Sequence, residues 1–222
     1  EKLVNEFIST IFSFFFNIQF CLHETNVATI GPVKKTVRLF QYLHLPADYE
    51  KIYKEYSENV KRNLKKAIKN NLRVETFISP EEIVALFKKT KGNELELFQP
   101  THYQLLIRLM NTCLAQEKGT TIAVYKGTEL YAAAFFMHNN NRFTYLKSGI
   151  TNEGKESGAM HFLMDRFIQL NAGKDKMLDF GGSSVESVAR FYKSFGAKDC
   201  VYLQLENGIL FKLLKWFKSF KR

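Results

Sequence analysis

Hydrophobic and polar positions along the chain repeat with two periods, which predict an alternation of strands and helices. Between residues 16 and 22, apolar side chains alternate with Asn17, Gln19 and Cys21. This period of two is typical of a half-buried strand. Further extended segments are predicted at 36–44, 73–78, 120–126, 129–137, 142–150, 176–180 and 199–206.

Helical spacing of apolar residues accounts for most of the remaining chain. The stretch 47–71 has one apolar stripe, and Ser57 is expected to cap a second helix inside it. The stripe consists of Tyr53, Tyr56, Val60, Leu64 and Ile68. A polar, glycine-bearing loop is expected over 151–158. Other helices are predicted at 1–12, from Pro80, from Pro100 to about 116, from the end of that loop, up to Ser194, and over 209–222.

The order of these elements predicts the fold class. From residue 120 onward the order is β-β-β-α-β-α-β. Hairpins combined with helical crossovers give an α/β (α+β) fold with one mixed sheet and helices on its faces. The chain has 222 residues, of which 45% are hydrophobic and 14% aromatic, so it can bury a core and is not a disordered protein.

The formal net charge of +10 is concentrated in two segments. Residues 51–73 hold eight basic and two acidic side chains, and residues 209–222 hold five basic and no acidic ones. For 51–73 the alternatives are a solvated helix face and a surface that binds the phosphates of RNA or of a lipid-linked sugar. For 209–222 they are a terminal helix docked on the domain and an amphipathic helix at a membrane surface.

Cysteines and histidines predict neither disulfides nor a metal site. Cys21, Cys113 and Cys200 are an odd number of widely spaced residues in apolar segments, so we expect buried, reduced thiols. The five histidines lack the spacing of metal ligands. No apolar run approaches the ~20 residues that a membrane span needs.

Three segments are candidates for chemistry. The strand, loop and helix over 146–160 offer glycines and a helix N-terminus, which suit a phosphate cradle, although a plain turn into a helix also explains them. Asp179 ends a strand before two glycines, so it is either a functional acid or the cap of a turn. In the segment 189–197, Phe191 and Phe195 are expected to pack inward and Tyr192 to point elsewhere.

A tyrosine such as Tyr192 can donate a proton to a leaving group if its hydroxyl is held in place. The alternative for Tyr192 is a residue at the helix surface or at the edge of the core.

Together these segments resemble the C-terminal half of a GNAT acyltransferase, and more closely the FemAB-like branch of that superfamily. The motif order carries the resemblance over roughly residues 50–206: Lys155-x-x-Gly158-Ala159, a strand ending in Asp-Phe-Gly, then Ala-Arg-Phe-Tyr-Lys-Ser-Phe-Gly-Ala. The segment Tyr56–Ala67 resembles the basic helix of that branch. The resemblance implies a mostly antiparallel mixed sheet flanked by helices.

The resemblance also implies a donor site. In GNAT enzymes an Arg/Gln-x-x-Gly-x-Gly/Ala loop binds the pyrophosphate of acyl-CoA through backbone N–H groups. Here Lys replaces the usual Arg or Gln, and Met stands where Gly or Ala is usual. The residues implied to bind the donor are Ile150, Gly154, Lys155, Gly158, Ala159 and Met160, with a backbone N–H near Ile150 polarising the thioester carbonyl.

The implied catalytic residues are Tyr192, which protonates the departing sulfur, and Asp179, which accepts the proton of the amine. Ser148, Lys193 and Arg62 are expected to bind substrate. Peptidoglycan-building members of the FemAB branch commonly have a lysine in place of the tyrosine. Here the lysine is the next residue, Lys193, which favours a thioester donor over aminoacyl-tRNA.

The implied activity is transfer of an acyl group from acetyl-CoA or another acyl-CoA to an amine acceptor, such as a cell-envelope or sugar precursor, in the cytoplasm or at the inner face of the membrane. Two alternatives stay open: aminoacyl transfer from tRNA to a peptidoglycan precursor, and a non-catalytic GNAT-like scaffold for a membrane or partner. Because FemAB-like proteins usually carry two GNAT-like halves, residues 1–50 are expected to be the remnant of a first half. Residues 51–208 would be the acyltransferase domain and residues 209–222 a basic amphipathic helix.

Overall fold

The computed structural model describes residues 1–15, 17–29, 33–90, 99–181 and 186–208. The chain divides into two compact units, one made of Glu1–Phe40 with Asp199–Arg222 and the other of Gln41–Lys198. Strand β2 (Lys34–His44) contributes residues to both units. The predicted domain boundaries at residues 50 and 208 stay predictions, and the predicted helix over 209–222 lies outside the described residues.

The smaller unit packs one helix against strands. Helix α1 (Lys2–Phe14) precedes β1 (Asn17–Cys21), which pairs antiparallel with β8 (Lys198–Gly208). The strand order is β1-β8-β2. The helix at the start of the chain and the alternating strand after it are therefore confirmed. The core of this unit consists of Ile8, Leu22, Ala28 and Leu205.

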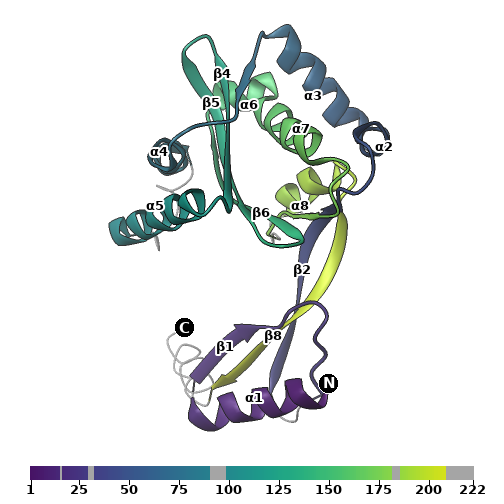
Figure 1. Ribbon diagram of the computed structural model, residues 1–222, viewed down its shortest axis with the longest axis vertical. Helices are drawn as coiled ribbons and strands as arrows, with labels where there is room; N and C mark the ends of the chain where they lie inside the picture. The colour runs from purple at the N-terminus through teal and green to yellow at the C-terminus, as the bar shows by residue number, and fades with distance from the viewer. Residues whose placement is uncertain (16, 30–32, 91–98, 182–185, 209–222) are drawn as a thin grey trace, which may run out of the picture. The chain divides into compact units, whose positions relative to one another are not determined.

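The larger unit is built on a mixed sheet of strand order β2-β7-β6-β5-β4-β3 (Figure 1). All neighbours are antiparallel except β6 and β7, which run parallel. This confirms the predicted mixed, mostly antiparallel sheet. Its remaining strands are β3 (Arg73–Glu75), β4 (Gly119–Lys126), β5 (Glu129–His138), β6 (Arg142–Ile150) and β7 (Met177–Asp179).

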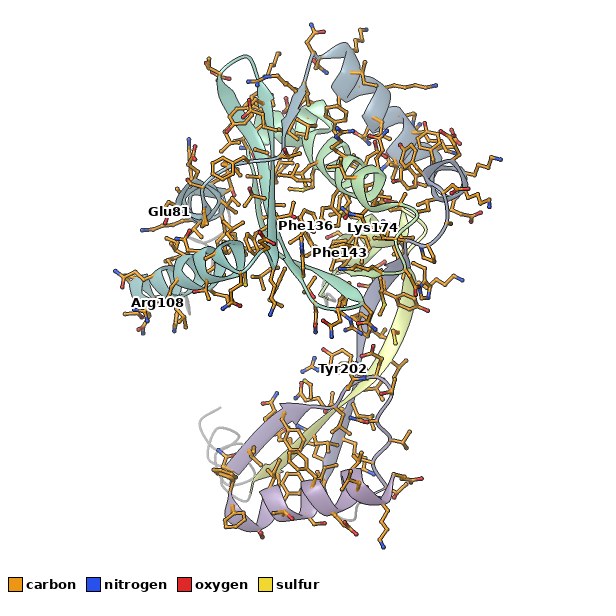
Figure 2. The ribbon with its side chains drawn as sticks, in the orientation of Figure 1. Glu81, Arg108, Phe136, Phe143, Lys174 and Tyr202 are labelled. Atoms are coloured by element: carbon orange, nitrogen blue, oxygen red, sulfur yellow. The ribbon has the colours of Figure 1, made fainter. Side chains whose placement is uncertain are left out.

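Helices cover both faces of this sheet (Figure 1). On one face lie α4 (Pro80–Thr90) and α5 (Pro100–Ala115). The helices that pack on the other face are α2 (Tyr49–Lys54), α3 (Glu58–Lys69), α7 (Ala159–Asn171) and α8 (Glu186–Lys193). Figure 2 shows the labelled Phe136 and Phe143 on the α7 side, where both contact the ring of Phe167.

The structure confirms the predicted break in the helical stretch at 47–71. The Ser57 hydroxyl accepts the Val60 N–H and caps α3. The predicted apolar stripe is wrong at Ile68, which is 64% exposed, whereas Ala67 is fully buried. At 3.6 residues per turn, Ala67 lies only about 20° around the helix from Val60, and Ile68 lies about 80° away.

Two further expectations are corrected. Residues Asn152–Ser157 form a short helix, α6, where a loop was predicted, because Thr151 caps it by accepting the Gly154 N–H. All three cysteines are free thiols, but only Cys113 is buried, and Cys21 is exposed on the solvent face of β1. Within the described ranges, no group of three or more His, Cys, Asp or Glu residues has the arrangement of a metal site, and no helix is long and apolar enough to cross a membrane.

Candidate functional site

The parallel strands β6 and β7 separate partway along β6, and we call this place the β6–β7 divergence point. The parallel register ends with the pair Thr144–Asp179. Strand β6 continues to Ile150, whereas the chain after β7 turns away, with the Phe180 N–H donating to the Gln41 carbonyl at 3.0 Å. The carboxyl end of a strand beside a separating neighbour is a common location for ligands in α/β sheets.

Five side chains meet at the divergence point and form what we call the tyrosine cluster: Tyr145, Ser148, Met160, Phe180 and Tyr192. The Tyr145 hydroxyl donates to Ser148 Oγ and lies 3.4 Å from Met160 Sδ. The Tyr192 ring stacks on Phe180, with centroids 4.6 Å apart, and meets Tyr145 edge-on at 6.1 Å. The cluster therefore joins β6, α7, α8 and the residue after β7.

Tyr192 is buried, which corrects the expectation that it points away from the core. It is 8% exposed, whereas Phe191 is only partly buried and Phe195 is fully buried. Burial raises the pKa of Tyr192 to about 12. The phenol therefore keeps its proton across the neutral range, and it is available as a hydrogen-bond donor and not as a base.

Asp179 caps the turn after β7, as one of the two alternatives predicted. Its Oδ1 accepts the Gly181 N–H at 2.7 Å, and its Oδ2 lies 3.0 Å from the Arg142 guanidinium. Oδ1 thus caps the turn, and Oδ2 belongs to a largely buried ion pair. The second expectation, that Asp179 takes a proton from the amine, stays a prediction.

The glycines of the expected cradle have a packing role that the sequence did not reveal. A Cβ on Gly154 would lie 2.5 Å from the Tyr131 carbonyl oxygen, and a Cβ on Gly158 would lie 2.6 Å from that of Asn63. Gly158 also has a φ of +79° between α6 and α7, which favours glycine. Both glycines therefore let the chain approach its own backbone closely, and a ligand contact there stays a prediction.

Helix α7 begins at Ala159, immediately after Gly158. The first N–H groups of a helix have no intrahelical acceptor, and they lie at the positive end of its dipole. Ala159 is buried and Met160 is half-buried within the tyrosine cluster. The helix start and the divergence point therefore lie together.

Three predicted ligand residues lie on exposed helix surfaces outside the tyrosine cluster. Lys155 of α6 donates to Asn152 Oδ1 at 3.0 Å. Lys193 is exposed at the end of α8, and Arg62 is exposed on α3. Of the remaining predicted residues, Ser148 belongs to the cluster, and Ile150 ends β6 and is half-buried.

Tyr145 is the site residue that sequence reasoning missed. Strict alternation along β6 would place Tyr145 and Ser148 on opposite faces of the sheet. The register shifts at Leu146, because Phe135 pairs with Lys147 and Phe136 with Tyr145. This bulge returns Ser148 to the face of Tyr145. Nothing in the residues 142–150 themselves indicates the bulge.

A family model described as the acetyltransferase (GNAT) domain matches residues 54–194. The chain belongs to this family. The matched range contains the β6–β7 divergence point, the start of α7 and Tyr192. No match was found among curated proteins. The GNAT family assignment and the mixed sheet together establish an acyltransferase fold.

Solved structures share this fold at low sequence identity. The crystal structure of FemX is 10% identical, with a TM-score of 0.61, and the match covers 96% of this chain and 78% of that chain. The C-terminal domain of a putative lysylphosphatidylglycerol synthetase from Agrobacterium fabrum is 13% identical, with a TM-score of 0.55, and the match covers 84% of this chain and 65% of that chain. At such identities the likeness concerns the fold.

Proposed function

We propose that the protein is an N-acyltransferase that moves an acyl group from acyl-CoA to an amine acceptor. The observation that carries the proposal is the position of Tyr192, a buried phenol at the β6–β7 divergence point of a GNAT domain. The start of α7 adjoins the same cluster through Met160. The Tyr192 hydroxyl, a hydrogen-bond donor, and the positive end of the α7 dipole therefore lie at one site.

The N-terminus of α7 supplies the binding of the donor. In this proposal the amides of Ala159 and Met160 face the pyrophosphate of acyl-CoA, and Lys155 adds a positive charge beside them. Gly154 and Gly158 hold α6 and α7 in place through their close approaches to the backbone. The amide near Ile150 polarises the thioester carbonyl oxygen, and Ser148 lines the same face of β6.

The amine of the acceptor attacks the thioester carbonyl carbon, the carbon–sulfur bond breaks, and the sulfur leaves as a thiolate. Tyr192 donates a hydrogen bond to that sulfur. Because its pKa is about 12 and that of a thiol is about 8.5, complete proton transfer is uphill, and the hydrogen bond is the main contribution of Tyr192. Asp179 accepts the proton of the amine directly or through water. Arg62 and Lys193 contact the acceptor.

Aminoacyl transfer from tRNA is a second candidate, and a specific surface favours it. One side of α3 exposes a basic stripe, Arg62, Lys65, Lys66 and Lys69. Among the described residues, none of these four has an ion-pair partner. Helix α3 packs beside α7 through its opposite, apolar side, so this basic stripe faces solvent on a helix that neighbours the proposed donor site. A phenol of pKa about 12 also matches an alcohol leaving group better than a thiol.

A thermal-shift titration distinguishes the two donors. Acetyl-CoA at a hundred times its dissociation constant should stabilise the folded protein by about 2.7 kcal/mol, which appears as a rise in Tm. A rise with acetyl-CoA and none with tRNA supports the first candidate. A rise with tRNA alone, with affinity falling steeply as salt increases, supports the second. No shift with either ligand contradicts both, and leaves a non-catalytic GNAT-like scaffold.

The proposal extends to the place of action. Acyl-CoA and aminoacyl-tRNA are both cytoplasmic donors, so we infer action in the cytoplasm. The basic and apolar residues of 209–222 would add a peripheral contact with the inner face of the membrane. Liposome pelleting with and without residues 209–222 tests that contact, and equal pelleting of the two chains removes it.

A further inference from the structure

The larger unit contains a cavity that shares no residue with the tyrosine cluster. It has a volume of about 320 Å³ and lies between the end of β2, helix α2 and the turn that leads from α8 into β8. Figure 1 shows α2 beside this end of β2. Ligand sites for small molecules begin at roughly this size, about 300 Å³.

The walls of the cavity are mainly apolar. Leu43 of β2 and Ile52 of α2 are core residues that also line the cavity. Ala47, which lies between them in the chain, lines it as well. Gly196 forms the opposite wall with a φ of +85°. A Cβ at that position would lie 3.1 Å from Glu55 Cβ, so the missing side chain keeps the space open. Such walls favour an apolar body in the ligand.

Tyr42 and His44 of β2 also border the cavity. Tyr42 and His44 are two residues apart, so their side chains leave the same side of the strand. Their ring centroids are 5.0 Å apart, and the rings meet edge-on. Both residues line the cavity. Leu43, which lies between them in the chain, leaves the opposite side of the strand, so the apolar wall of the cavity consists of Leu43, Ala47 and Ile52.

The charges around the cavity are predominantly positive. Lys51 approaches from α2 and Lys198 from the start of β8, and both are exposed, whereas Glu55 is the one acid in the lining. Lys51 has an ion pair with Asp48 at 3.7 Å, but both side chains are more than 70% exposed, and such a pair contributes little. The two ammonium groups are therefore available to a ligand.

We propose that this cavity binds a small organic anion with an apolar body, namely a carboxylate or phosphate ester that carries an aromatic or branched aliphatic group. The apolar part lies against Leu43, Ala47 and Ile52. The anionic group lies between Lys51 and Lys198. The site is separate from the proposed donor site and does not depend on the identity of the acyl donor.

Calorimetric titration of the full chain with three probes tests the proposal: phenylacetate, phenyl phosphate and benzylamine. Phenylacetate and phenyl phosphate should bind saturably, at millimolar dissociation constants or tighter, and benzylamine at least about tenfold more weakly. The ratio between the two anions shows which anionic group the lysines prefer. Lys51→Glu combined with Lys198→Glu should weaken anion binding about tenfold or more.

Lys54→Glu is the matched control for Lys51→Glu, because it makes the same charge change on the same helix outside the lining. It should leave binding within about twofold of the original protein. Ala47→Leu fills the cavity and should abolish binding, and the Tm of each variant verifies folding. Saturable binding of neither anion, equal weakening by Lys54→Glu, or benzylamine binding as tightly as phenylacetate would each overturn the proposal.

Discussion

The ring of Tyr192 stacks on the ring of Phe180, the residue that directly follows β7. This contact fixes the position of α8 relative to the strand end, with the two centroids 4.6 Å apart. Packing of the ring therefore fixes the position of Tyr192, and Tyr192→Phe removes the hydroxyl while it keeps the ring. The proposed role of Tyr192 can thus be tested without disturbing the fold.

Tyr192→Phe should lower turnover about a hundredfold, since a hydrogen bond to the charge that develops in the transition state typically contributes at least that much, while KM for acetyl-CoA stays nearly constant. The measurement is thiol release from acetyl-CoA by the protein in the presence of an amine acceptor. Tyr125→Phe, on β4 among the residues that pack with α4 and α5, is the control. Equal turnover of the Tyr192 variant and the original protein would exclude its role.

Gly158→Ala should destabilise the protein more than Gly173→Ala. Both glycines have φ near +80°, so both variants incur the left-handed backbone strain of about 1 kcal/mol. Only at position 158 does the new Cβ also meet the Asn63 carbonyl oxygen, whereas nothing lies within 4 Å at position 173. We expect about 1–3 kcal/mol of additional destabilisation for Gly158→Ala by urea unfolding. Equal losses would show that α3 does not constrain the α6–α7 corner.

Stability should fall as the pH drops from about 6.5 to about 4, and His161 is one cause. Burial lowers the pKa of His161 to about 4, below the ordinary 6.5 of the unfolded chain. The unfolded chain therefore binds a proton in this window that the folded protein does not, so acid favours unfolding. The ring lies among Phe191 and Phe195, and His161→Phe keeps an aromatic ring there.

The pH dependence of the His161→Phe variant should be flatter by up to about 3 kcal/mol over this window, at 1.36 kcal/mol per pKa unit. Chemical denaturation at pH 7, 5.5 and 4.5 measures it. Parallel curves for the variant and the original protein would contradict the buried, neutral state of His161. Asp165 acts in the opposite direction, because burial raises its pKa and the folded state then gains stability as the carboxyl is protonated.

The sequence predicts the secondary structure of the larger unit well, but it predicts the tyrosine cluster only in part. The hairpins between 119 and 150 follow from alternation and from turn residues, and the Ser57 cap follows from its position before α3. These are local signals. By contrast, helix α6 depends on the Thr151 cap and on the fit of Gly154 against Tyr131 of the neighbouring strand β5.

The remaining differences also arise from tertiary contacts. Tyr192 is buried because Phe180 and Tyr145 arrive from elsewhere in the chain, and helical spacing alone favoured Phe191. The bulge at Leu146 places Tyr145 and Ser148 on one face, and it depends on the pairing with β5. Because the site is assembled from four elements, no single segment of the sequence predicts all of it.

Asp179→Asn and Arg142→Gln should have different effects on catalysis although both break the same ion pair. The pair is largely buried, with side-chain exposures of 12% for Asp179 and 20% for Arg142, so each variant should cost about 1–3 kcal/mol of stability. If the Asp179 carboxylate takes the proton of the amine, Asp179→Asn should lower turnover about a hundredfold, and Arg142→Gln much less. Similar losses in the two variants would assign Asp179 a structural role alone.

The central claim is that acyl-CoA binds at the start of α7, beside the tyrosine cluster. Calorimetric titration of acetyl-CoA into Met160→Glu and Gln169→Glu tests it most directly, because both variants add one negative charge to α7, at its first turn and near its end respectively. The account predicts that Met160→Glu weakens acetyl-CoA binding about tenfold or more, and that Gln169→Glu leaves it unchanged. Equal affinities of the two folded variants, or no binding by the original protein, would contradict the account.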